Sequence, residues 1–223
     1  MLKKLKQLNP FKTIYFNFKM FPLNQAFKMP VYIGYHTKFV SLKGDIHIES
    51  ILKPGMIRFG FGNVGIVDKR YTRTLIELNG TIIFKCTANF GYGSKISVGK
   101  KGILKVGERF DISANSTIIC FESITFEDDV LFSWDILVMD TDFHETINTI
   151  TNEINHCTTK PIYLGSNTWV GARSILLKGT EVPANTIIGA GSILNKKYDI
   201  RENCLLAGIP VCIKKENIKR YIN

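Results

Sequence analysis

The chain has 223 residues, of which 45% are apolar and 22% are charged. This composition is that of an ordinary folded protein and excludes a disordered or fibrous chain, and the length suits one large domain. No stretch of the sequence approaches the roughly eighteen unbroken apolar residues of a membrane span. Residues 1–20 mix lysines among their apolar residues, unlike a signal peptide, so we expect a cytoplasmic protein.

The formal net charge of +10 is concentrated at the N-terminus. Residues 1–44 carry eight lysines and no acidic residue, whereas the rest of the chain holds 21 basic and 19 acidic residues. The arm of residues 1–30 is also rich in leucine and phenylalanine, which predicts either a cap over the end of the domain or, through residues 1–21, a peripheral contact with an anionic membrane surface at the inner face of the cell membrane. No nucleic-acid-binding motif accompanies the lysines, so we expect no nucleic-acid partner.

The cysteines are odd in number and form no C-x-x-C pair; they are Cys86, Cys120, Cys157, Cys204 and Cys212. Neither a disulfide framework nor a thiolate metal site is predicted, and we expect no bound metal. The thiols are interpreted as small buried apolar residues.

A six-residue repeat dominates the second half of the chain. Every sixth residue is aliphatic at Leu164, Val170, Leu176, Val182, Ile188 and Leu194. A hydroxyl residue follows each of the first five by four positions, at Thr168, Ser174, Thr180, Thr186 and Ser192. Runs with the same period but fewer hydroxyl partners extend over residues 106–136 and 78–96.

The period has a physical interpretation. Because six is a multiple of two, the same side of an extended chain recurs at each step, whereas a helix of 3.6 residues per turn would rotate these positions apart. A repeat of six residues can supply one flat face and one corner, and three such faces close a triangular coil. The sequence therefore predicts an all-β parallel β-helix with a solid interior, so that any active site lies on its outside.

The stretch from Lys160 to Lys196, KPIYLGSNTWVGARSILLKGTEVPANTIIGAGSILNK, resembles the hexapeptide-repeat acyltransferases. Among them it is most similar to the maltose and galactoside O-acetyltransferase branch and to bacterial polysaccharide-biosynthesis acetyltransferases. The resemblance implies a left-handed parallel β-helix, which we expect over residues 31–213, and a homotrimer with active sites between subunits. A short lysine-rich helix over Lys214–Ile222 is expected within a C-terminal tail of residues 214–223.

The repeat loses its phase once, between Ile136 and Leu164, which are 28 residues apart. The intervening sequence is polar and rich in Asn and Thr, which predicts a loop at about residues 145–160 that leaves the β-helix. Just before this loop stands His144, with Asp140, Asp142 and Glu145 beside it. A histidine held by a carboxylate at one ring nitrogen can accept a proton at the other, as a general base requires.

The family resemblance also points to His144, since these enzymes carry their catalytic histidine just before an extruded loop. We expect Asp142 to orient its ring, with Asp140 and Glu145 as alternatives. Asn115 lies close to the place of a family asparagine that helps orient the acceptor, although a solvent-facing coil residue is an equal interpretation. His156, deeper in the loop, is interpreted as non-catalytic.

By the same resemblance, acetyl-CoA would lie along the C-terminal coils. The matching positions are Trp169, Gly171, Ala172, Ala190, Asn195, Lys196 and Lys215. The implied function is transfer of an acetyl group from acetyl-CoA to a hydroxyl of a sugar or glycan, in cell-surface polysaccharide biosynthesis. Two alternatives stay open at this point: N-acylation of an amino sugar, and a non-catalytic β-helix that serves as a scaffold at the membrane surface.

Overall fold

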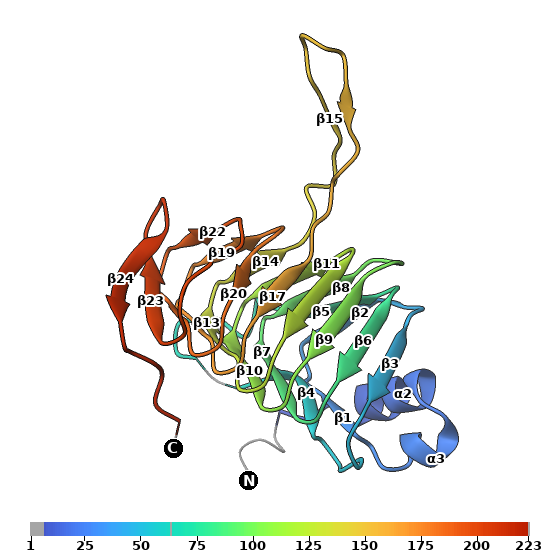
Figure 1. Cartoon of the computed structure of the whole chain (residues 1–223). Coiled ribbons are helices and arrows are strands. Elements are labelled where there is room, and N and C mark those ends of the chain that lie inside the picture. Colours follow the sequence, from blue (N-terminus) through green and yellow to red (C-terminus); the bar gives the residue numbers. More distant parts are fainter. Residues whose placement is uncertain (1–6, 63, 223) are drawn as a thin grey trace.

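The computed structural model describes residues 7–62 and 64–222 (Figure 1). The first six residues of the predicted N-terminal arm lie outside the described residues. The described strands wind into a left-handed parallel β-helix with three faces, which confirms the predicted fold class.

Each coil of the β-helix contributes one strand to each face in turn, and the faces are numbered here in that order. The first face contains β1 (Val31–Ile33), β4 (Ile57–Phe61), β7 (Ala88–Tyr92), β10 (Phe110–Ala114), β13 (Leu131–Trp134), β18 (Trp169–Val170), β21 (Ile187–Ile188), β23 (Cys204–Ala207) and β24 (Cys212–Glu216). The second face contains β2 (Thr37–Leu42), β5 (Thr74–Leu78), β8 (Lys95–Val98), β11 (Thr117–Cys120), β14 (Leu137–Met139), β19 (Ile175–Leu177) and β22 (Ile193–Leu194). The third face contains β3 (Asp45–Ile48), β6 (Thr81–Phe84), β9 (Ile103–Val106), β12 (Ser123–Phe126), β17 (Ile162–Leu164) and β20 (Glu181–Val182).

The register of the strands confirms the six-residue repeat in the C-terminal coils. Val170 pairs with Ile188 and Leu176 with Leu194, so each of these coils takes 18 residues. The earlier coils are longer, because Asp111 pairs with Leu131, 20 residues on. The aliphatic run over residues 106–136 is therefore buried but does not stack six by six.

The hydroxyl residues of the repeat lie inside the corners of the C-terminal coils. All five are fully buried. The hydroxyl of Thr168 donates to the carbonyl of Gly165 at 2.6 Å, and Thr180, Thr186 and Ser192 each donate to the carbonyl three residues before them. A buried carbonyl at a sharp turn needs a partner, and a short hydroxyl side chain supplies it without widening the coil.

The filling of the interior follows the size of the coils. The longer N-terminal coils are packed with phenylalanines; those with at most 1% exposure include Phe59, Phe84, Phe90, Phe110, Phe126 and Phe132. The rings of Phe59 and Phe90 stack with their centroids 4.6 Å apart. The shorter C-terminal coils are filled by Val, Leu and Ile, because a narrower interior has no room for rings.

The N-terminal end of the β-helix is covered by α2 (Pro10–Met20), which is followed by the short α3 (Leu23–Ala26). Asn17, which is fully buried, bonds both backbone groups of Val31 in the edge strand β1: its amide donates to the carbonyl at 2.7 Å and its oxygen accepts from the N–H at 3.2 Å. The Thr13 hydroxyl accepts from the N–H of Ile33 at 3.1 Å. The helix thus blocks the free edge that the first strand would otherwise expose.

The predicted C-terminal helix over Lys214–Ile222 is wrong. Residues 212–216 instead form β24, which pairs antiparallel with β23. The open edge of β23 offers backbone partners to any chain that returns beside it, and this outweighs the weak helical preference of a short lysine-rich segment. Beyond the strand, the Arg220 guanidinium donates to the backbone carbonyl of Asp129 and to Asn167.

Two further findings concern the cysteines and membrane spans. The prediction of buried thiols is wrong for Cys157 and Cys212, which are exposed, and Cys86 is half-buried. Over residues 7–62 and 64–222, no helix is both long and apolar enough to cross a membrane.

Replacing Asn17 with alanine should destabilise the fold. The substitution leaves the backbone groups of Val31 buried without partners, which we expect to lower the free energy of unfolding by about 2 kcal/mol. Urea unfolding of the variant measures the change, with Asn24→Ala, an exposed position in α3, as the matched control. Equal stability of the two variants would mean that the cap does not depend on this contact.

Candidate active site

A two-stranded hairpin leaves the β-helix at the corner between the second and third faces. It begins after β14, where Thr141 forms a β-bridge with Thr159, and its strands are β15 (Thr146–Ile147) and β16 (Ile154–Asn155). Figure 1 shows the hairpin standing away from the body of the molecule. The predicted extruded loop is therefore present, but it starts at residue 141, four residues before the expected boundary.

Asp140 anchors the base of the hairpin. Its fully buried carboxylate accepts hydrogen bonds from the backbone N–H groups of Phe121, Glu122 and Ser123 at 2.7 to 2.9 Å. Burial raises the pKa of Asp140 above the ordinary value of an aspartate, although the three N–H groups oppose this shift. Asp140 holds the preceding coil in place, so the expectation that it could orient His144 is wrong.

Lys178 fastens the neck of the hairpin to the β-helix. Its ammonium lies 2.6 Å from the carboxylate of Asp142 on the outgoing strand and donates to the carbonyl of Cys157 on the returning strand at 2.9 Å. One side chain of the β-helix therefore contacts both strands of the neck. A second contact joins the strands further out, where His156 Nδ1 lies 2.7 Å from Glu145 Oε1.

His144 lies in this neck, between the two contacts, and is exposed. Within the described part of the chain its ring has no hydrogen-bond or ion-pair partner, because Asp142 binds Lys178, Glu145 binds His156 and Asp140 is buried. The predicted pairing of Asp142 with His144 is thus not formed in a single chain. Both nitrogens of His144 are free to meet a group that approaches from outside.

Next to the neck lies a pocket of about 420 Å³ lined by a column of lysines. Lys160, Lys178 and Lys196 are spaced 18 residues apart, the length of one coil, and so lie one above another on the corner between the second and third faces. Asp142, Lys197 and the predicted cofactor residue Asn195 also line the pocket. Successive coils are about 4.8 Å apart, so stacked ammonium groups repel one another and favour an anion with several charges.

The remaining predicted contacts divide between this corner and a second one. Gly171, Ala172 and Ala190 lie at the corner between the first and second faces, on the other side of β19 and β22 from the lysine column. Asn115 lies on the same second corner, where its amide donates to Asp135 at 2.5 Å. A single chain therefore does not bring Asn115, Ala172 or Ala190 together with His144.

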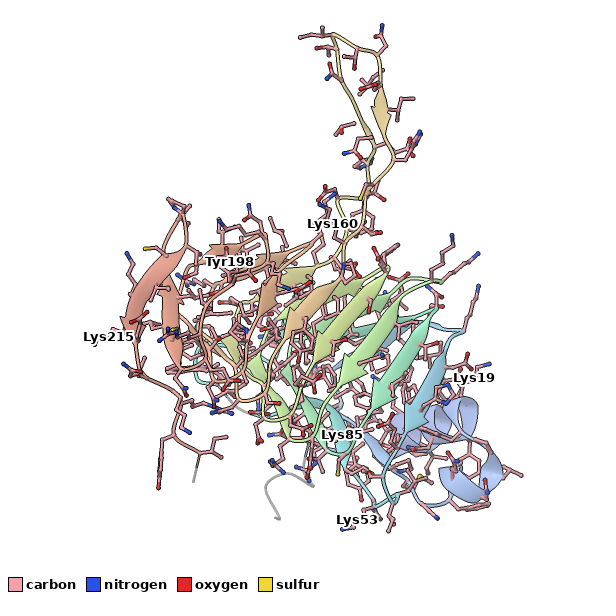
Figure 2. The ribbon with its side chains drawn as sticks, in the orientation of Figure 1. Lys19, Lys53, Lys85, Lys160, Tyr198 and Lys215 are labelled. Carbon is pink, nitrogen blue, oxygen red and sulfur yellow. The ribbon has the colours of Figure 1, made fainter. Side chains whose placement is uncertain are left out.

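Trp169 and Lys215 lie on the first face, away from the lysine column. The Trp169 indole N–H donates to the Ser133 hydroxyl at 3.1 Å. Lys215 is on β24, beside Leu205, at the C-terminal end of the β-helix. Figure 2 shows Lys215 at that end and Lys160 at the base of the hairpin, so Lys215 is not among the residues that surround the pocket.

Sequence reasoning missed Lys160, Lys178 and the pair formed by Glu145 and His156. The lysines carried a usable signal, because with Lys196 they recur every 18 residues in the part of the chain where the six-residue repeat is regular. The Glu145–His156 pair depends on the register of the hairpin, which sequence spacing does not determine. Among residues 7–62 and 64–222, no group of three or more His, Cys, Asp or Glu side chains could hold a metal ion.

No protein-family model matches the sequence, and no curated protein matches it. Among solved structures, the polySia-specific acetyltransferase NeuO aligns with a TM-score of 0.51 and 18% identity over 86% of this chain and 79% of its own. A maltose O-acetyltransferase from Clostridium difficile 630 is 25% identical with a TM-score of 0.45, over 52% of this chain and 60% of that enzyme, which is less than two thirds of its length. A hexapeptide-repeat-containing acetyltransferase from Vibrio cholerae O1 biovar eltor, complexed with acetyl coenzyme A, gives 18% identity and a TM-score of 0.46 over 60% of this chain and 70% of its own.

The likeness to NeuO concerns the fold. The resemblance to hexapeptide-repeat acetyltransferases that the sequence predicts is thus confirmed at the level of the β-helix. Fold alone does not define an activity, so what the corner and its hairpin can do depends on their residues.

Replacing Asp140 with alanine should loosen the base of the hairpin. Three backbone N–H groups lose their common acceptor, which we expect to lower the free energy of unfolding by about 2 kcal/mol in urea titrations. Asp142→Ala, which removes only a surface ion pair, should cost less than about 1 kcal/mol. A larger loss of stability in the control than in the Asp140 variant would contradict the anchoring role.

Proposed function

We propose that this protein is an O-acetyltransferase that moves an acetyl group from acetyl-CoA to a hydroxyl of a sugar, in the biosynthesis of a cell-surface polysaccharide. The proposal is supported by an unpaired, exposed histidine beside a pocket suited to a polyanion, on a fold similar to that of the acetyltransferase NeuO. The observation that carries it is the position of His144 in the neck of the hairpin, next to the lysine column.

The lysine column suits the phosphates of coenzyme A. Three phosphate-bearing positions on one ligand match a row of ammonium groups better than any neutral ligand would, and Lys160, Lys178 and Lys196 supply that row. When bound, acetyl-CoA supplies an activated thioester carbonyl. Small residues at Ala172 and Ala190 leave the neighbouring corner open to an extended thiol arm.

His144 would act as the general base. A ring nitrogen of His144 takes the proton of the acceptor hydroxyl as the hydroxyl oxygen bonds to the acyl carbon, and the imidazolium returns that proton to the departing thiolate sulfur. The exposure of the ring lets it reach an acceptor as large as a glycan. A backbone N–H, by family resemblance that of Ala172, would donate to the oxyanion.

The same geometry supports a homotrimer. Within one chain, His144 and the lysine column lie on one corner, and Asn115, Ala172 and Ala190 lie on another. A complete set therefore needs the second corner of a neighbouring copy beside the first. The hairpin adds a reason for association, because Ile147, Ile150 and Ile154 are at least 51% exposed on it, and apolar side chains at such exposure favour a protein surface.

Replacing His144 with alanine should lower acetyl transfer at least about a hundredfold, because the base is removed while an exposed side chain leaves the fold unchanged. Release of free coenzyme A thiol, with hydroxyl and amino sugars assayed side by side, measures the rate and separates O- from N-acylation. His156→Ala is the matched control and should retain activity within about threefold. Full activity of the His144 variant would refute the mechanism, and a protein without activity in either form would favour the scaffold.

Mixing two inactive variants tests whether the site is shared. His144→Ala removes the base from one corner, and Ala190→Trp, at an exposed position, blocks the other. In randomly mixed trimers, each site that joins two chains has about a one-in-four chance of receiving both intact halves, so activity should return to about a quarter of the wild-type rate. Activity at the level of the separate variants would place the whole site within one chain.

A further inference from the structure

The outward side of α2 is apolar, although its inward side already covers the end of the β-helix. Phe11, Ile14, Tyr15 and Phe18 are spaced i, i+3, i+4 and i+7, which aligns them along one side of the helix. They are 83%, 50%, 56% and 36% exposed, respectively. We call these four residues the outer stripe. A helix that is apolar on two sides is expected only where both sides have a partner.

Segments beside α2 extend the apolar surface. Phe27 is 71% exposed and its ring meets that of Phe18 edge-on at 5.1 Å. Leu23, at the start of α3, is 66% exposed. Residues 7–44 contain five lysines and no acidic residue, and Lys19 and Lys28 are exposed within this region (Figure 2 labels Lys19). The surface therefore combines large apolar side chains with positive charge.

A basic pocket adjoins the outer stripe. Its volume is about 520 Å³, and the charged and titratable residues in its lining are Lys12, His36, Lys38 and Arg73, with no acidic residue among the described lining residues. Phe39 also lines it, and the ring of Tyr15 in the outer stripe lies 6.0 Å from that of Phe39. Burial and then the charge of Arg73 lower the pKa of Lys12, whose ammonium donates to the carbonyls of Tyr35 and Thr37 at 2.8 and 2.6 Å.

We propose that this end of the molecule binds the surface of an anionic membrane, with the outer stripe in the interfacial region and the basic pocket on the phosphate of a lipid headgroup. Aromatic and aliphatic side chains enter the boundary between headgroups and acyl chains, and lysines add an attraction to anionic lipid. The proposal does not depend on the acetyltransferase activity, because none of these residues belongs to the corner that carries His144.

A second copy of the chain is the less suitable occupant. Two such ends facing each other would bring together two surfaces that are basic and free of acidic residues between positions 7 and 44. Their repulsion would have no compensating charge across the contact. An anionic lipid surface supplies both the apolar medium and the opposite charge.

Flotation with lipid vesicles tests the proposal. The full chain should float with vesicles of phosphatidylcholine containing about one third phosphatidylglycerol, and binding should weaken as salt is added. The double variant Phe11→Glu/Ile14→Glu should lose at least about tenfold in bound fraction. Ile66→Glu, an equally exposed apolar position outside the cap, is the matched control and should float as the wild type does.

A second pair of substitutions tests the pocket. Lys38→Glu/Arg73→Glu should remove the preference for anionic over pure phosphatidylcholine vesicles, and inorganic phosphate at millimolar concentration should not replace it. Circular dichroism and urea unfolding check that each variant is folded. Undiminished flotation of both double variants would overturn the proposal. So would a drop in the mass of the wild-type assembly, in the absence of vesicles, on introducing Phe11→Glu/Ile14→Glu, since that outcome identifies a second copy as the occupant.

Discussion

The ladder of parallel strands between successive coils is the interaction on which the rest of this structure depends. Because Val170 pairs with Ile188 and Leu176 with Leu194, the position of a residue within its coil determines the face or corner on which it lies. The coils lie so close that a Cβ atom on Gly171 would come within 2.6 Å of the backbone nitrogen of Ala190. A prism stacked this tightly has no internal cavity for a ligand, so chemistry is confined to its surface.

The same ladder turns a spacing in sequence into a surface in space. Three lysines one coil apart form a column, and this column becomes an anion site only because the hairpin rises beside it. Lys178 belongs to both features, since it lines the pocket and binds Asp142 and Cys157 in the hairpin neck. The histidine and the pocket are therefore positioned relative to each other by a side chain of the β-helix.

The two ends of the β-helix solve one problem in different ways. A parallel sheet leaves an open edge at each end, and open edges invite pairing with other chains. At the C-terminus the chain turns back and fills the edge with β24, whereas at the N-terminus Asn17 and Thr13 of α2 satisfy the backbone of β1. A strand leaves little new surface, but a helix has a second side, and here that side is apolar and flanked by lysines.

The amino-acid sequence by itself determined the β-helix, the interruption of its repeat and the histidine at that interruption, because a side-chain period of six in an extended chain is a local property that survives folding. Only the tertiary structure decided which groups meet. It paired Glu145 with His156, buried Asp140 under three N–H groups and separated Ala190 from His144 by the width of a face. It also gave β24 to a segment expected to be helical. Such pairings depend on the register of a hairpin and on a free strand edge, which arise from contacts between distant parts of the chain rather than from the order of neighbouring residues.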